Sequence, residues 1–260
     1  MTRAVRTVLI ILLAVLPAAC VSTTSNDQGA IQNDSKPDYV EAAKLNTQLG
    51  IDYARQNQDD LAMEKLKRAL EQDPRLPAAH STIAYLYAKR GEDGEADKHY
   101  RRALELDPKD ASTKNNYGVF LCAHQRAVEA GKLFHEAAAD KQYRSPEVAL
   151  TNAGVCERKK PDLAAAERDF RAALKANPNF ADALSQMAWL SYQQKDYLRA
   201  RAFLQRYQQA GPATPETLLI GALTEKALGD TVAAGAYEQR LRKEFPESDE
   251  SGSLPHASAP

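Results

Sequence analysis

Apolar and polar positions along the chain repeat with a period of 34 residues. The unit is clearest from Pro77 to Asp110, PAAHSTIAYLYAKRGEDGEADKHYRRALELDPKD. Two stretches of this unit have apolar residues spaced as on one face of a helix, and the polar turn Gly-Glu-Asp-Gly lies between them. The same pattern fits once before this unit and four times after it. A fixed period of this length predicts a solenoid of repeated helix pairs.

Small residues and a proline recur at fixed positions of the unit, counted from Pro77 as position 1. Position 8 is always glycine or alanine: Gly50, Ala84, Gly118, Gly154, Ala188 and Ala222. Position 20 is always alanine: Ala62, Ala96, Ala130, Ala166, Ala200 and Ala234. Residues without atoms beyond Cβ let two helices approach closely, so these positions predict the contact within each helix pair. Position 32 is proline in five of the six units, where it ends the second helix because it lacks an N–H.

This arrangement resembles the tetratricopeptide repeat (TPR). The resemblance implies an all-α fold, a right-handed superhelical solenoid of about six TPR helix-turn-helix repeats. The predicted repeats are residues 43–76, 77–110, 111–146, 147–180, 181–214 and 215–248, within a solenoid that spans 38–248. The third repeat is two residues longer, and the sixth has Glu238 where a bulky apolar residue usually lies. We expect the polar tail, 249–260, to be disordered.

The N-terminus predicts export from the cytoplasm. Arg3 and Arg6 precede an unbroken apolar run, residues 8–16, which is too short to span a bilayer. Small residues then lead to Cys20, as in a bacterial lipobox, although Pro17 stands where an aliphatic residue is usual. The lipobox resemblance implies a signal peptide at 1–19 and a lipid on Cys20, whereas ordinary signal cleavage beside an incidental cysteine is the alternative.

The residues after Cys20 bear on where such a lipoprotein would reside. Val21, rather than aspartate, follows the cysteine, and by the sorting rule of bacterial lipoproteins this implies the outer membrane, facing the periplasm. Residues 20–37 are rich in serine, threonine, asparagine and aspartate and have no apolar period, so we expect a flexible tether there.

Charge and motifs exclude several classes of function. The chain has 34 basic and 35 acidic residues and a net charge of −1, which argues against nucleic acid as the main partner. The phosphate-binding loop, the Gly-x-Ser-x-Gly elbow and the His-Glu-x-x-His zinc motif are all missing from the sequence. The five histidines do not pair at helical metal-ligand spacing, and His80, at position 4, is expected to be a half-buried structural residue. We therefore expect a protein that is not an enzyme and has no catalytic residues, cofactor, metal or small-molecule substrate.

Two further cysteines, Cys122 and Cys156, lie on the predicted first helices of the third and fourth repeats. First helices of adjacent repeats stack side by side, and the periplasm is oxidising, so a disulfide between them is the favoured interpretation. The alternative is two small buried residues that never meet, because register alone does not bring two Cα atoms within about 7 Å.

A binding face follows from the same register. In TPR proteins the first helices line the concave surface, and position 9 points into it. Position 9 is apolar in every repeat, a set that we call the position-9 ladder: Ile51, Tyr85, Val119, Val155, Trp189 and Leu223. Position 5 is mostly small and polar and is predicted to form a polar groove margin: Thr47, Ser81, Asn115 and Thr151. Such a groove suits an extended segment or an amphipathic helix of another protein. The alternative is that the ladder only packs against neighbouring helices.

Two stretches narrow the functional class. Residues 114–122, KNNYGVFLC, and 146–156, PEVALTNAGVC, follow a lipobox in a chain of six repeats. Together they resemble the type IV pilus biogenesis lipoproteins of the PilF/PilW type, over nearly the whole mature chain. In that family Cys20 corresponds to the lipid attachment site, and Cys122 and Cys156 match family positions.

The family resemblance implies a pilotin that is anchored in the outer membrane by its N-terminal lipid. Its partner would be the secretin subunit of the type IV pilus machinery, which it would help to reach the outer membrane and to form a multimeric pore. Two other TPR lipoprotein classes remain as alternatives, namely a scaffold for outer-membrane β-barrel assembly and an adaptor for peptidoglycan hydrolases.

Overall fold

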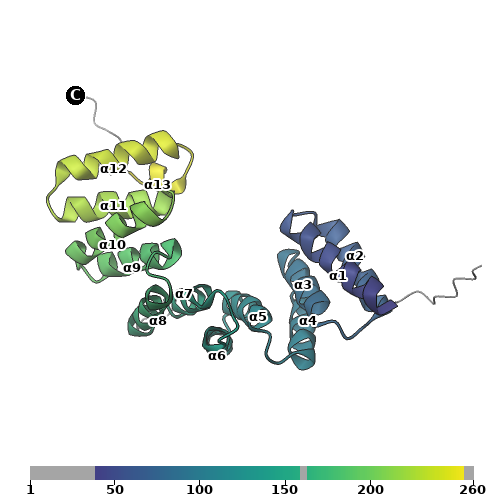
Figure 1. Ribbon diagram of the computed structural model, residues 1–260. Coiled ribbons are helices and arrows are strands. Elements are labelled where there is room, and N and C mark those ends of the chain that lie inside the picture. Colours follow the sequence, from purple (N-terminus) through teal and green to yellow (C-terminus); the bar gives the residue numbers. More distant parts are fainter. Residues whose placement is uncertain (1–38, 159–162, 255–260) are drawn as a thin grey trace, which may run out of the picture. The chain divides into compact units, whose positions relative to one another are not determined.

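The computed structural model describes residues 39–158 and 163–254, and every regular element in these two stretches is an α-helix (Figure 1). The predicted signal peptide, Cys20 and the predicted tether lie outside the described residues. In chain order the helices are α1 (Tyr39–Arg55), α2 (Asp59–Gln72), α3 (Pro77–Lys89), α4 (Asp93–Leu106), α5 (Ala111–Ala123), α6 (Ala127–Ala139), α7 (Pro146–Glu157), α8 (Leu163–Ala176), α9 (Ala181–Gln193), α10 (Tyr197–Ala210), α11 (Pro215–Ala227), α12 (Thr231–Glu244) and α13 (Asp249–Gly252). Among these helices, none has the length and the apolar content needed to cross a bilayer.

The helices form consecutive pairs, as the 34-residue period predicts. Each odd-numbered helix from α1 to α11 packs against the helix that follows it and also against the next odd-numbered helix (Figure 1). The first helices of successive repeats are therefore neighbours, so the predicted all-α fold of helix-turn-helix repeats is confirmed.

A small residue on the first helix and a large one on the second set the distance between the helices of a pair. A Cβ atom added to Gly118 would lie 2.6 Å from Phe134, and one added to Gly154 would lie 2.5 Å from Phe170. Both phenylalanines are fully buried, and so is the alanine at position 20 in the first five repeats. Since real side chains do not approach this closely, glycine is required at these two sites for the observed spacing.

The sixth repeat makes the same contact one residue earlier on both helices. A Cβ on Gly221 would lie 2.5 Å from the ring of Tyr237, so Gly221, rather than Ala222, is the point of close approach. Glu238, which occupies the expected apolar position, is instead half-buried and lies 4.0 Å from Lys226. Only this close contact moves by one residue, because Tyr237 is the bulky side chain available to fill the gap.

In the five repeats whose internal turn the structure describes, one left-handed residue lies at position 15. Gly91 and Gly229 have φ angles of 74° and 81° there, as glycine readily allows. Asn57, Gln125 and Lys195 adopt φ angles of 57°, 62° and 61° at the equivalent place. A left-handed residue ends the first helix and lets the chain reverse into the second.

The C-terminal segment differs from its prediction. Residues 249–254 were expected to belong to a disordered tail, but α13 forms there, and Ser248 caps it by accepting a hydrogen bond from the N–H of Ser251. Leu254 is buried against Leu218 and Leu241. The prediction was wrong for these residues because one apolar side chain in a polar tail is enough to cover the exposed end of the last repeat.

The close approach at position 8 can be tested with a pair of glycine variants. Gly118→Ala is expected to lower the free energy of unfolding by about 1–3 kcal/mol, because its Cβ must displace Phe134. Gly235→Ala is the matched control: apart from the surrounding backbone of α12, no atom lies within 4 Å of its added Cβ, so it should gain up to about 1 kcal/mol from helix propensity. Urea unfolding followed by circular dichroism measures both; equal effects in the two variants would contradict the packing argument.

Candidate partner-binding face

The position-9 ladder lies on the six first helices, but its members are not equally accessible. Tyr85 on α3 and Val119 on α5 are 44% and 48% exposed. The other four members are half-buried: Ile51, Val155, Trp189 and Leu223. The accessible part of the ladder is therefore in the second and third repeats.

Tyr85 separates two hollows on this face. One, of about 310 Å³, lies toward α1 and includes Ile51, Ala54 and Ser81 in its wall. The other, also about 310 Å³, lies toward α5 and includes Val119 and Phe120. The wall of the second hollow is largely apolar, so the pair of hollows can accept two apolar side chains on either side of the Tyr85 ring.

Asn116 lines both hollows, and sequence reasoning missed it. It lies at position 6, three residues before Val119, and is exposed, whereas its neighbour Asn115 is buried. Residues three apart share one face of a helix, so the spacing to position 9 was the signal that could have identified it. Its amide can both donate and accept hydrogen bonds, which suits the backbone of a bound segment.

The predicted polar groove margin is mostly engaged inside the protein. The hydroxyl groups of Thr47 and Thr151 donate to the backbone carbonyls of Ala43 and Glu147, at 2.9 and 2.7 Å. The Asn115 side chain accepts a hydrogen bond from Asn152 at 3.0 Å. All four margin residues are buried, and only Ser81 lines one of the two hollows.

Charged side chains at the rim of the hollows are neutralised by neighbours. Lys89 lies 2.7 Å from Asp59, and this hydrogen bond raises the pKa of Lys89. His124 lies 2.9 Å from Asp93, and its pKa is raised first by its hydrogen bond to the Phe120 carbonyl and then by Asp93. Because Lys89 and His124 both contact acidic side chains, the hollow between Tyr85 and Val119 favours apolar surface over a charged ligand.

The ladder residue of the fifth repeat, Trp189, is covered by neighbouring side chains. Trp189 packs in the same cluster as Met187 and Val155, and the Arg158 guanidinium lies 4.2 Å from the centre of its ring. The Arg158 side chain also donates to Gln186 at 2.6 Å, which holds it in place, and burial lowers its pKa. At Trp189 the ladder therefore contributes to packing, which is one of the two interpretations that the sequence left open.

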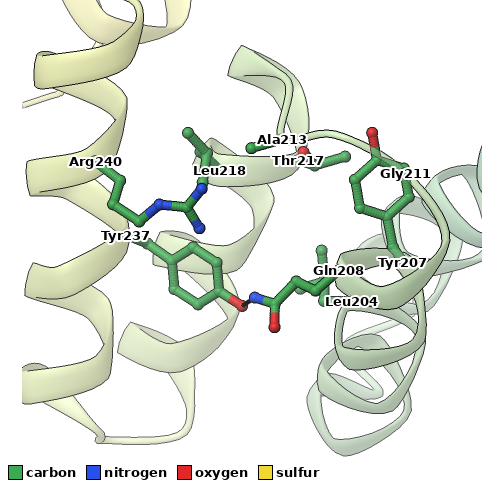
Figure 2. Close-up of a pocket in the computed structure, with 9 residues that line it drawn as sticks. All are labelled: Leu204, Tyr207, Gln208, Gly211, Ala213, Thr217, Leu218, Tyr237 and Arg240. Carbon is green, nitrogen blue, oxygen red and sulfur yellow. Dashed lines mark hydrogen bonds between the residues drawn. The ribbon is translucent and has the colours of Figure 1, made fainter.

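A third hollow, of about 240 Å³, lies where α10, α11 and α12 meet (Figure 2). Figure 2 shows Gln208 and Tyr237 converging across it, and the amide of Gln208 donates to the Tyr237 hydroxyl at 2.7 Å. The Tyr207 hydroxyl donates to the carbonyl of Pro212 at 2.6 Å. Both phenol oxygens are engaged within the protein, and none of the residues that line this hollow belongs to the position-9 ladder. We therefore interpret it as a packing gap between the fifth and sixth repeats and not as a second binding face.

Cys122 on α5 and Cys156 on α7 meet as a disulfide, with their Cα atoms 5.8 Å apart. Both cysteines belong to the buried cluster that also contains Phe120, a wall residue of the hollow beside Val119. A covalent link at this place fixes the third repeat to the fourth immediately behind the candidate binding face.

Reduction of this disulfide should destabilise the protein. Closing a chain separation of 34 residues corresponds to about 3–4 kcal/mol on the chain-entropy model. We expect the purified oxidised protein to have a higher Tm than the same protein in a phosphine reductant, and Cys122→Ala to abolish this difference. Alkylation followed by mass spectrometry provides the second measurement: two modified thiols at these positions without reductant would contradict the prediction.

Comparison with known proteins first defines the class. Family models of the tetratricopeptide repeat match residues 77–110 and 159–218. The matched stretches include the second repeat, from which the register was taken, so the TPR prediction is confirmed.

Individual relatives then define the family. The type IV pilus assembly protein PilF of Pseudomonas aeruginosa is 33% identical over 244 residues, covering 94% of this chain and 95% of its own. Its solved structure, from a functional characterisation of P. aeruginosa PilF, has a TM-score of 0.75 and 31% identity and covers 82% of this chain and 96% of that one. The crystal structure of PilW, described as a widely conserved type IV pilus biogenesis factor, has a TM-score of 0.74 and 31% identity, over 81% of this chain and 97% of that one. The chain belongs to this PilF/PilW family of TPR proteins of type IV pilus biogenesis, as the sequence resemblance predicts.

Proposed function

We propose that the protein is a pilotin, an outer-membrane lipoprotein that binds the secretin subunit of the type IV pilus and promotes its localisation and multimerisation there. The observation that carries this proposal is the similarity to PilF along nearly the full length of both chains. The relative is described as a type IV pilus assembly protein, and the pilotin role is our extension from that description.

The candidate face suggests how a secretin segment is held. Two hollows flank Tyr85, one of them largely apolar, and Asn116 borders both. An amphipathic helix or an extended segment can place one apolar side chain in each hollow while its polar side remains in water. This binding requires no catalysis, because the helix pairs form a rigid scaffold that shields apolar surface of the client.

The proposed lipid on Cys20 supplies membrane residence. An acyl anchor attaches a protein to a bilayer without a spanning helix. Eighteen residues separate Cys20 from the first residue of α1. The flexible tether predicted from the sequence would have a root-mean-square length of roughly 20–25 Å, which would let the repeats search for a client close to the membrane.

A pair of ladder variants tests the binding face. Tyr85→Ala with Val119→Ala is expected to abolish heat-resistant secretin multimers and twitching motility while changing Tm little, because both side chains are about half exposed. Trp189→Ala is the matched control and should lower Tm, because it empties a site covered by Arg158. Multimers and motility that persist in the double variant would remove this face from the proposal.

The anchor is tested separately with Cys20→Ser. We expect this variant to leave the outer-membrane fraction, because no acyl chain can attach, and to leave secretin multimers reduced or in the inner membrane. Membrane fractionation and immunoblotting measure both effects. Normal multimers and motility in a strain lacking the whole protein, with defective β-barrel insertion or septation instead, would assign the protein to one of the other TPR lipoprotein classes.

A further inference from the structure

Two histidine side chains face each other across the helix pair of the second repeat. His80 lies on α3 and His99 on α4, and their Nδ1 atoms are 3.0 Å apart. Their rings are tilted with centroids 5.0 Å apart, and both side chains are half-buried. The sequence search for metal ligands missed this pair because it looked for histidines one turn apart on one helix.

The outer nitrogen of His80 orients its ring. Nε2 lies 3.1 Å from the backbone carbonyl of Pro74, which can only accept a hydrogen bond, so Nε2 has the proton. In the neutral ring, Nδ1 is then the acceptor, and the Nδ1–H of His99 donates to it across the 3.0 Å contact. Binding of a metal by both Nδ1 atoms therefore requires the proton of neutral His99 to move from Nδ1 to Nε2. Histidines that bind metals commonly donate their other ring N–H to a backbone carbonyl, as His80 does.

Burial favours the neutral form of both rings. It lowers the pKa of His80, and burial first, with the positive charge of a protonated His80 second, lowers the pKa of His99 to about 4. Neutral imidazole is the form that binds a metal ion, so a change of tautomer at His99, with no loss of a proton, leaves both Nδ1 atoms able to act as ligands.

We propose that His80 and His99 form a binding site for Zn²⁺, in which the two Nδ1 atoms are the protein ligands and water completes the coordination. Two nitrogens at about 2.0–2.1 Å from a tetrahedral zinc ion are roughly 3.3 Å apart. The observed separation is 3.0 Å, so the rings need to move apart by only a few tenths of an ångström.

The surroundings set the strength of this site. The described residues contain no group of three or more histidine, cysteine, aspartate or glutamate side chains that could hold a metal ion. Glu95 lies one turn before His99 on α4, and its negative charge raises the pKa of that histidine. Glu95 is, however, already paired with Lys98, at 3.1 Å. The positive charge of Arg102 lowers the pKa of His80, and Arg102 is itself paired with Glu105 at 3.0 Å. We therefore expect a weaker site than a four-ligand structural zinc centre.

Occupancy of the site would join α3 to α4 through their side chains. Tyr85, which separates the two hollows, lies on α3 a little more than one turn after His80. Zinc would therefore stabilise the helix pair that presents Tyr85, whatever partner binds there.

Zinc titration of the full chain, purified in detergent and stripped with EDTA, tests the proposal. Calorimetry should detect one site that His80→Gln or His99→Gln weakens at least about tenfold. Free Zn²⁺ at ten times Kd should raise the Tm of the native protein by about 3–6 °C. His135→Gln is the matched control, because His135 is an exposed histidine on α6 that bonds to Asp169 at 2.9 Å, and it should change neither result.

A second measurement does not depend on the folding of any variant. Nitrogen NMR of the native protein should show zinc shifting the Nδ1 resonances of His80 and His99. The Nε2 resonance of His80 should stay in place, and that of His99 should move as this nitrogen takes up the proton. A native Tm and Nδ1 resonances that zinc leaves unchanged would overturn the proposal. Equal zinc affinity in the native protein and in the His80→Gln, His99→Gln double variant would do the same, because the metal would then be held elsewhere.

Discussion

The close contact between position 8 on the first helix and a large side chain on the second is the constraint on which the described structure depends. Gly118 against Phe134 and Gly154 against Phe170 leave no room for even one methyl group. With each pair held at this spacing, the first helices of neighbouring repeats lie beside one another. The position-9 ladder, the disulfide and the two hollows all follow from that placement.

Accessibility along the ladder is decided by single neighbouring side chains. Tyr85 and Val119 remain about half exposed, whereas Trp189 is covered by the guanidinium of Arg158. The same register position thus presents apolar surface to a partner in one repeat and packs within the protein in another. Exposed apolar surface keeps a fixed shape only where packed side chains support it, so the accessible and the packed ladder positions depend on one another.

Cross-links between helices surround the exposed part of the ladder. The disulfide joins α5 to α7 behind the hollow that contains Phe120, and the histidine pair joins α3 to α4 in the repeat that presents Tyr85. TPR repeats contact mainly their neighbours, so a local link stabilises the repeats that it joins more than the chain as a whole. Both links thus act where the candidate face needs a fixed shape.

The sequence by itself determined the helix pairs, their order and the family, because these depend on periodicity and on equivalent positions in successive repeats. It placed Cys122 and Cys156 on neighbouring first helices, but the tertiary structure was needed to show that their Cα atoms lie 5.8 Å apart. Only the tertiary structure decided which ladder residues are accessible, that Asn116 and not Asn115 faces the hollows, and that His80 meets His99. It also decided the shift of the close contact to Gly221 and Tyr237 and the burial of Leu254 on the last repeat. The physical reason is common to all of these: burial and side-chain contact depend on atoms from other helices, whereas the repeat pattern records only the positions within one unit.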